Sequence, residues 1–428
     1  DYDNDGSLDL FVTNSAKWTL DDQPSSKYFQ GKSGLRALAD SPKEINALYH
    51  NNRDGTFTEV TEPAGLKGSG WGGDVAAFDY DEDGNIDLFV TNMFGLSQLY
   101  RNLGDGKFVD VTPQTLGRTS WGAIGSKVFD GNNDGKLDLL IVDMHSDMWA
   151  PFENFPGVLE TVQQSSRKKF SMVTGPISQF DRNAFDEEKR LVDSFQVEKS
   201  KVVFGNTMFQ NSGNGKFEEV SDKARLESFW PWGIATGDFD NNQNEDVFLP
   251  SGMGYPFFYW PNALMMGNDD GIYEDRSRTE GIEPPARGIH FEQKLGGKAA
   301  ARSSRCASSA DFDGDGRLDL MVNNFNDQPY YFKNEFPQRN YVAFRLRGTK
   351  SNRDAVGAVM RLFVGNKILT RQVHSAGGYL SQSSKTLHWG LGEHSEIDRV
   401  EIRWPSGLRQ KIDNLAINTL HELTEPEE

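Results

Sequence analysis

The sequence has a single cysteine, Cys306, so no disulfide can form within the chain and its stability must come from other interactions. It has no run of about 18 or more apolar residues, and therefore predicts no transmembrane segment. Basic residues are in the minority, with 45 Lys and Arg against 63 Asp and Glu, which gives a formal net charge of -18. That balance argues against a nucleic-acid partner, because phosphates require Lys and Arg, and against a polybasic membrane-binding role.

Helical periodicity is scarce, whereas glycine is abundant, with 43 residues, and this combination favours a turn-rich β architecture. No signal-peptide pattern is present. The sequence begins directly on an acidic loop with no strand before it. We interpret this start as a trimmed or incomplete N-terminus, which is compatible with a removed signal peptide.

The opening stretch, DYDNDGSLDLFV, places four aspartates within nine residues. It recurs at Asp79, Asp130, Asp238 and Asp311 with the template D-x-[DN]-x-[DN]-G-x-x-D, from which only the fourth copy departs, with Gln243 in place of the glycine. An apolar run typical of a strand follows each copy. The sequence therefore contains at least five copies of one unit.

A second signature alternates with the acidic one. The stretches LYHNNRDGTFTEV, LYRNLGDGKFVDV, MFQNSGNGKFEEV and, more loosely, LMMGNDDGIYEDR place Asp-Gly or Asn-Gly between alternating apolar residues, which predicts hairpins. Asp79 and Asp130 are 51 residues apart, as are Leu48 and Leu99, and this period suits one four-stranded blade of a β-propeller.

The acidic loops have the composition of a site for a hard divalent cation. Side chains at positions one, three, five and nine and the backbone carbonyl at position seven can converge on one ion, and glycine at position six permits the sharp turn. The predicted ligands are Asp1, Asp3, Asp5, Ser7, Asp9, Asp79, Asp81, Asp83, Asn85, Asp87, Asp130, Asn132, Asp134, Lys136, Asp138, Asp238, Asp240, Asn242, Asn244, Asp246, Asp311, Asp313, Asp315, Arg317 and Asp319.

These ligands predict up to five Ca²⁺ ions. Mg²⁺ fits less well because it requires stricter octahedral geometry, and zinc or copper is disfavoured because the loops contain no Cys or His. The alternative is that Asp and Gly only form turns, but five copies at blade-like spacing favour the metal site. We expect the fourth loop to be the weakest site, because Asn242 replaces a carboxylate and Gln243 replaces the glycine.

Calcium would account for much of the acidity. The five loops contain 18 aspartates, and five Ca²⁺ ions would change the net charge from -18 to -8. Without metal the loops repel themselves, so folding and calcium binding should be linked. Because cytosolic calcium is scarce, we expect an extracellular or periplasmic location.

The motifs resemble the FG-GAP/VCBS repeats of integrin α-subunit propellers and of the cartilage acidic protein family. Trp-Gly elements before the loops (GWGGDVAAFD, SWGAIGSKVFD, PWGIATGDFD) add to this resemblance. It implies an all-β fold with a β-propeller of seven blades. Further along, GTKSNRDAVGA, GYLSQS and WPSG resemble an ASPIC/UnbV domain, and the alternation of VEIRW and YVAFRLRG predicts a small β-sandwich.

The resulting domain prediction is a propeller over residues 1–335 and an ASPIC/UnbV-like β domain over 340–424. Insertions are expected near 15–45, 146–201 and 252–300. The second insertion contains FDEEKRLVDSF, a predicted helix, with a degenerate blade as the alternative.

Three other groups could carry function. Asp143, His145 and Asp147 could form a metal or acid-base cluster, although a structural role is favoured. The aromatic stretches ESFWPWG and GYPFFYWPN could bind sugar rings or a partner, although core packing is favoured. Arg302 and Arg305 could hold an anion, although a solvated or ion-paired surface is favoured.

The sequence favours a calcium-stabilised extracytoplasmic module that binds a protein or matrix partner as a scaffold or adhesion element. No nucleophile elbow, P-loop, dinucleotide fingerprint or zinc-protease helix is apparent. This absence does not exclude catalysis, because a propeller can build an active site from scattered loops, but an enzyme is the less favoured interpretation. An enzyme with its site on the propeller face and a glycan-binding module are the alternatives.

Overall fold

The computed structural model describes residues 1–14, 45–66, 68, 71–93, 95–144, 201–228, 230–252, 261–282, 293–295, 298–300, 303–325 and 328–427. Within these ranges the regular secondary structure consists of strands, apart from two α-helices of a single turn each, α2 (Thr112–Thr115) and α5 (Ser221–Ala224). The all-β prediction is therefore confirmed.

Five antiparallel sheets follow one another along residues 1–335, one for each acidic loop. The first contains β1 (Leu10–Val12), β2 (Ala47–Asn51) and β3 (Phe57–Glu59). The second contains β4 (Trp71–Phe78), β5 (Asp87–Met93), β6 (Gln98–Asn102) and β7 (Phe108–Asp110). The third contains β9 (Ala123–Phe129), β10 (Asp138–Asp143), β12 (Thr207–Gly213) and β13 (Lys216–Glu219). The fourth contains β14 (Ala235–Gly237), β15 (Asp246–Leu249), β16 (Ala263–Gly267) and β17 (Tyr273–Asp275), and the fifth contains β20 (Ser303–Ala310), β21 (Asp319–Phe325) and β22 (Tyr330–Phe332).

Two small additions accompany these sheets: β8 (Thr119–Ser120) pairs with β11 (Val202–Val203), and β18 (Gln293–Leu295) pairs with β19 (Lys298–Ala300). In the second to fifth sheets the acidic loop joins the first strand to the second. The predicted hairpins form at β2–β3, β6–β7, β12–β13 and β16–β17. Both sequence signatures therefore form the structures that they predict.

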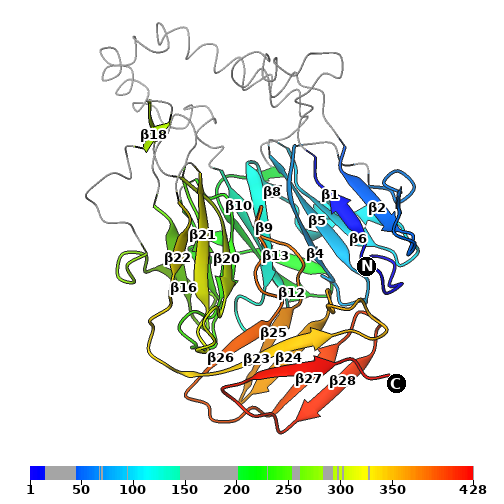
Figure 1. Cartoon of the computed structure of the whole chain (residues 1–428). Coiled ribbons are helices and arrows are strands. Elements are labelled where there is room, and N and C mark those ends of the chain that lie inside the picture. The colour runs from blue at the N-terminus through cyan, green and yellow to red at the C-terminus, as the bar shows by residue number, and fades with distance from the viewer. Residues whose placement is uncertain are drawn as a thin grey trace, which may run out of the picture.

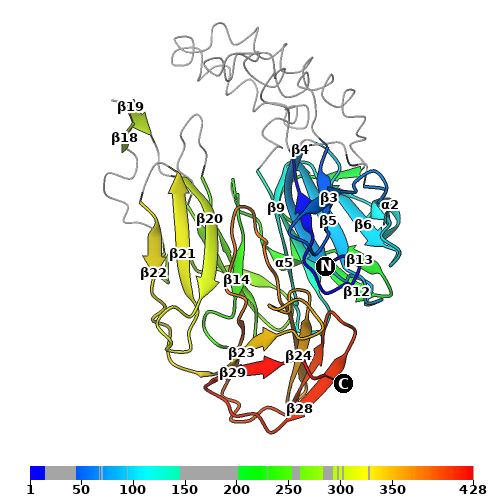
Figure 2. The same ribbon diagram turned by 45° about the vertical axis from the view of Figure 1, so that its right-hand side comes forward.

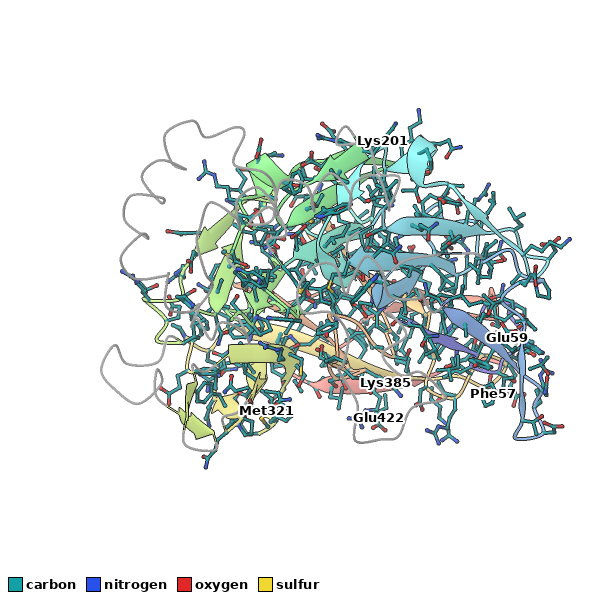
Figure 3. All side chains as sticks on the ribbon, turned by 90° about the horizontal axis from the view of Figure 1, so that it is seen from above. Phe57, Glu59, Lys201, Met321, Lys385 and Glu422 are labelled. Atoms are coloured by element: carbon teal, nitrogen blue, oxygen red, sulfur yellow. The ribbon has the colours of Figure 1, made fainter. Side chains whose placement is uncertain are left out.

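The second strand is buried on both faces in the second, third and fourth sheets. β5, β10 and β15 have no exposed residue, although an isolated antiparallel sheet would alternate between buried and solvent-facing positions. Hydrophobic clusters explain this burial, because each contains residues of two successive sheets. Figure 3 shows the sheets in chain order from blue near Glu59, through cyan and green near Lys201, to yellow-green near Met321. The count of seven blades and the closure of a ring stay predictions.

The C-terminal residues form two further sheets. One has the order β26-β23-β29 and the other β25-β24-β27-β28, and Phe344, Trp389, Leu362 and Ile402 from the two sheets share one buried cluster. Their bounds are β23 (Asn340–Arg347), β24 (Val359–Val364), β25 (Lys367–Gln372), β26 (Leu387–Gly392), β27 (Arg399–Arg403), β28 (Arg409–Asp413) and β29 (Leu420–Thr424). These two sheets lie against one end of the five repeat sheets (Figures 1 and 2).

Two of the C-terminal motifs converge on one carboxylate. The backbone N–H groups of Thr349, Lys350 and Ser351 in GTKSNRDAVGA donate to Glu425 Oε2 at 2.7, 2.9 and 2.9 Å. The hydroxyl of Ser406 in WPSG donates to Glu425 Oε1. The two motifs therefore fix the end of β29 to two turns on other strands.

The third motif, GYLSQS, lies in a connection between β25 and β26 that reaches between the repeat sheets (Figures 1 and 2). Gly378 donates its N–H to Ser126 O at 3.0 Å and accepts a hydrogen bond from Ile234 N at 3.0 Å. Ser384 donates its N–H to Ser309 O at 3.2 Å. This segment, residues 374–386, thus contacts the first strands of the third and fifth sheets and the chain just before β14.

Candidate metal-binding loops

The first aspartate of each loop organises the turn. Asp79 accepts hydrogen bonds from Asp83 N at 3.0 Å and Gly84 N at 2.9 Å, and the first aspartates of the third, fourth and fifth loops bind the equivalent N–H groups. Position six requires a positive φ, which Gly84 supplies at +98°. Gln243 adopts φ +82° at this position, so the predicted strain of the fourth loop is present.

The last aspartate of each loop fastens the loop to its own sheet. Asp87 Oδ2 accepts a hydrogen bond from Tyr80 N at 3.1 Å, and Asp87 Oδ1 accepts one from Asn102 N in β6 at 2.7 Å. The same pair of bonds occurs in the other four loops. Position nine therefore has a structural role in addition to its predicted role as a ligand.

The carboxylate at position three points into the loop. Oδ1 of Asp3, Asp81 and Asp240 is buried and makes no hydrogen bond. In the first, second and fourth loops this residue lies with the aspartates at positions one and nine, and one ligand atom from each lies within 4.8 Å of the others. Asp311, Asp313 and Asp315 form such a group in the fifth loop. A divalent cation fits these four loops. In the first, second and fourth loops it would coordinate a buried carboxylate oxygen that has no hydrogen-bond donor, and in the fifth loop it would bind three neighbouring carboxylates.

The third loop differs. Asn132 occupies position three, and within the described residues Asp130, Asp134 and Asp138 do not form a three-carboxylate group of this kind. An amide oxygen can ligate Ca²⁺, but with one negative charge fewer. The third and fourth loops each contain three aspartates, but only those of the fourth converge on one point, and the expectation that the fourth loop is the weakest site stays a prediction.

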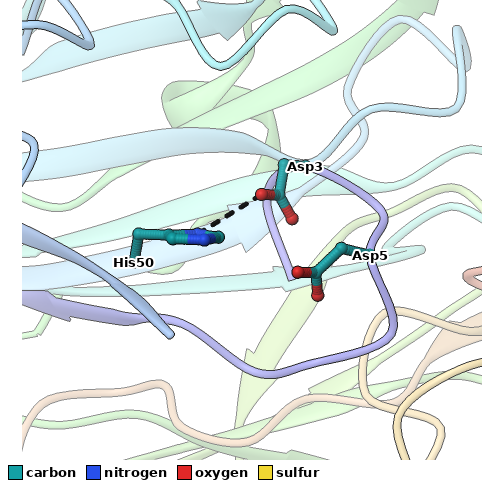
Figure 4. A group of neighbouring side chains, drawn as sticks. All are labelled: Asp3, Asp5 and His50. Carbon is teal, nitrogen blue, oxygen red and sulfur yellow. Dashed lines mark ion pairs between the residues drawn. The ribbon is translucent and has the colours of Figure 1, made fainter. Parts of the chain in front are cut away.

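Basic side chains lie beside the carboxylate at position three. His50 Nδ1 lies 3.3 Å from Asp3 Oδ2 (Figure 4), Arg101 Nε lies 2.8 Å from Asp81 Oδ2, and Lys333 Nζ lies 2.6 Å from Asp313 Oδ2. All three occupy the same position, directly before Asn51, Asn102 and Asn334 at or just beyond the end of β2, β6 and β22. Where position three is Asn132, the equivalent residue is the neutral Gln210. In the fourth loop it is Met266, and Arg339 pairs with Asp240 at 3.0 Å instead.

Burial favours the neutral form of several loop carboxylates. It raises the pKa of Asp87 to about 8 and that of Asp138 to about 7, and neighbouring carboxylates add to both shifts. A cation in the loop would oppose both effects. The loops therefore have the electrostatics expected of a site in which negative charge needs a counter-ion.

Sequence reasoning missed a chain of hydrogen bonds between successive repeats. Asn102 Nδ2 donates to Tyr2 O at 2.6 Å, Asn211 Nδ2 to Tyr80 O at 3.0 Å and Asn334 Nδ2 to Phe239 O at 2.7 Å. Each acceptor is position two of the preceding loop. The fourth repeat has Gly267 in place of the asparagine, and the hydroxyl of Tyr273 donates to Gly131 O at 3.4 Å. The sequence signal was an Asn just before the hairpin turn in LYHN, LYRN, MFQN and YFKN.

The C-terminal sheets contact the loops directly. Arg403 Nη1 lies 2.5 Å from Asp79 Oδ2, Thr370 N donates to Asp130 Oδ2 at 3.2 Å, and Gly390 N donates to Asp238 Oδ2 at 3.1 Å. The loops therefore lie between the repeat sheets and the C-terminal sheets.

The other candidate groups have structural contacts where the structure describes them. Asp143 is buried and accepts a hydrogen bond from Gly122 N at 2.8 Å, whereas His145 and Asp147 lie outside the described residues. Trp230 is part of the core, and the Arg305 guanidinium stacks 4.2 Å above the Trp232 ring and donates to Gly252 O. Core packing is thus confirmed for Trp230. Residues 253–260, the predicted helix and Arg302 lie outside the described ranges.

Comparisons with known proteins agree with the repeat structure. The family described as "FG-GAP-like repeat" matches residues 1–90 and 79–141, and the family described as "ASPIC and UnbV" matches residues 348–428. The chain therefore carries FG-GAP-like repeats followed by an ASPIC/UnbV segment.

The chain is homologous to cartilage acidic protein 1. It is 22% identical to the Homo sapiens protein over 408 residues, which cover 88% of this chain and 58% of that protein. It is 23% identical to the Xenopus tropicalis protein over 418 residues, which cover 94% and 52%. The chain thus spans a little over half the length of these relatives.

Among solved structures, the V. cholerae biofilm matrix protein Bap1 aligns at 11% identity with a TM-score of 0.30, covering 95% of this chain and 60% of that one. In the part of the chain that the structure describes, no helix is long and apolar enough to cross a membrane.

Proposed function

We propose that the chain is a calcium-binding extracellular interaction module. The observation that carries the calcium proposal is the buried Oδ1 of Asp3, Asp81 and Asp240, which has no hydrogen-bond donor and lies beside two more carboxylates. Carboxylate donors dominate these groups and favour Ca²⁺ over zinc or copper, although His50 lies with Asp3 and Asp5 at the first loop, and an irregular loop favours Ca²⁺ over Mg²⁺. Up to five ions would bind, with the third loop weakened by Asn132 and the fourth by Asn242 and Gln243.

The proposed architecture is a propeller followed by a β-sandwich. The order of the sheets, the clusters shared by neighbouring sheets and the hydrogen bonds from each repeat to the preceding loop support a propeller. The single core shared by the two C-terminal sheets supports a sandwich. Calcium would hold the ends of the repeats that face the C-terminal sheets.

The proposed role is a scaffold or adhesion module for a protein or matrix partner. The homology to proteins named cartilage acidic protein and the net charge of -18 support an extracellular partner rather than nucleic acid. The enzyme alternative has less support, because Asp143 is held by a backbone hydrogen bond in the core.

Calorimetric titration of the metal-depleted chain tests the calcium proposal. We expect several sites for Ca²⁺ and weaker binding of Mg²⁺. Asp81→Ala should remove one site, whereas Asp105→Ala, which changes an exposed hairpin-turn aspartate, should remove none. The same heat from both variants would show that the signal does not come from the loops. Capture of partners from native extract, with and without chelator, tests the interaction role.

A further inference from the structure

A cavity of about 90 Å³, with both apolar and charged lining residues, lies between the repeat sheets and the C-terminal sheets. Lys127 of β9, Ser309 of β20 and Glu245 line it from the repeat side, and Arg371 of β25, Ser383 and His388 of β26 line it from the C-terminal side. One water needs roughly 10–15 Å³ by this measure, so the cavity has room for several waters or one small molecule.

The charged groups that line this cavity are mainly positive. Three cations, Lys127, Arg371 and Lys385, face one carboxylate, Glu245. Arg371 pairs with Glu245 at 2.5 Å, and Lys385 pairs with Asp354 at 2.5 Å. These pairs leave the charge of Lys127 uncompensated.

Lys127 is the main anomaly of the cavity. The residue is 9% exposed, and its ammonium forms no ion pair or hydrogen bond within the described part of the chain. Burial lowers the pKa of Lys127, and the charges of Glu245 and Asp74 oppose this shift from a distance. An anion in the cavity would supply the partner that the ammonium lacks.

Other unsatisfied atoms on the wall define the anion further. Arg371 Nε is a buried donor without a partner. His388 Nε2 faces Gly316 O at 3.0 Å and therefore carries the proton, which leaves the unpartnered Nδ1 as an acceptor. The buried Gln372 Oε1 is a second acceptor without a partner. A ligand that suits the wall thus needs several accepting oxygens and at least one hydroxyl.

We propose that the cavity binds a small hydroxylated oxoanion, of which hydrogen phosphate is the probe that fits. Its oxygens would accept from Lys127 and Arg371, and its hydroxyl would donate to His388 or Gln372. Because the wall comes from both halves of the chain, the bound anion joins the C-terminal sheets to the repeats. Ordered water alone is the competing occupant.

The test is a titration of the full chain with inorganic phosphate at constant ionic strength and constant calcium, followed by calorimetry and thermal unfolding. We expect one saturable site and a melting temperature that rises with phosphate. Sulfate, which has no hydroxyl at neutral pH, should bind about tenfold more weakly. If no saturable binding is found up to about 50 mM phosphate, the anion proposal is wrong and the cavity holds only water. If sulfate binds as tightly as phosphate, the part of the proposal that requires a hydroxyl on the anion is wrong.

Two variants locate the site. Lys127→Met should weaken phosphate binding at least about tenfold, whereas Lys216→Met, at an exposed lysine of β13, should leave it unchanged. If Lys127→Met does not fold, Gln372→Glu provides the second variant, because a carboxylate facing the anion should also reduce its affinity. Unchanged affinity in the folded variant would overturn the assignment of the cavity. Because the calcium concentration is the same in all of these titrations, a lack of phosphate binding would not bear on whether the acidic loops bind calcium.

Discussion

The replacement Asn211→Ala tests the hydrogen bonds that join successive repeats. Asn211 is 4% exposed, and its amide donates to Tyr80 O at 3.0 Å and Leu137 O at 3.3 Å. Its Oδ1 accepts from Gly213 N at 2.8 Å. Each buried group left without a partner costs about 1–3 kcal/mol, so with partial relaxation we expect a loss of about 3 kcal/mol in the free energy of unfolding.

A matched control exists in the first repeat. Asn51 has the same position and donates to Leu8 O at 2.9 Å, but its amide contacts no loop of another repeat within the described residues and the bond is exposed. Asn51→Ala should therefore cost about 1 kcal/mol. Urea unfolding followed by tryptophan fluorescence measures both variants. Equal losses would refute the reasoning that the bond between repeats adds stability.

Three further predictions concern single residues. Asp83→Ala should lower the melting temperature in calcium and change it little in chelator, and equal losses in both conditions would mean that this loop is only a turn. Gln243→Gly should raise stability by about 0.5–1 kcal/mol in chemical denaturation because it relieves a positive φ, and a loss would show that the contact of Gln243 Nε2 with Leu391 O outweighs that strain. Burial alone would raise the pKa of Glu425, but its hydrogen bonds outweigh burial and lower the pKa to about 2. Glu425→Gln should therefore reduce the free energy of unfolding by about 2 kcal/mol at pH 7, and by progressively less as the pH falls from about 4.5 to 2. A loss that does not change with pH would contradict this.

Local patterns in the sequence predicted much of this structure. The acidic template and the Asp-Gly or Asn-Gly turns lie within a dozen residues, and backbone sterics and hydrogen bonds within such a stretch determine its shape. This is why the loop at Asp79 and the hairpin of β6 and β7 have their expected forms.

Long-range pairing was not predictable in the same way. Asn102 meets Tyr2 across 100 residues, and Asn211 meets Tyr80 across 131 residues. The segment 374–386 reads as an ordinary Gly- and Ser-rich loop, yet it packs between the first strands of several repeats. These groups meet only once the sheets have packed. Each strand has two faces, and the sequence does not show which other sheet or segment covers each face.

The ranking of the loops shows the same limit. Gln243 does adopt the strained conformation that its place in the sequence predicts, yet Asp238, Asp240 and Asp246 still converge. Each of the two loops has one amide in place of a carboxylate, Asn132 at position three of the third loop and Asn242 at position five of the fourth. The position of the amide, which the sequence does give, therefore decides whether three carboxylates converge, but the sequence alone does not show which positions meet.

Anomalous diffraction from crystals grown in millimolar Ca²⁺ tests whether the acidic loops bind calcium. We expect a peak about 2.3–2.6 Å from Oδ1 of Asp3, Asp81 and Asp240, with the carboxylates at positions one and nine around it. Loops that show no peak at saturating calcium would contradict the calcium proposal.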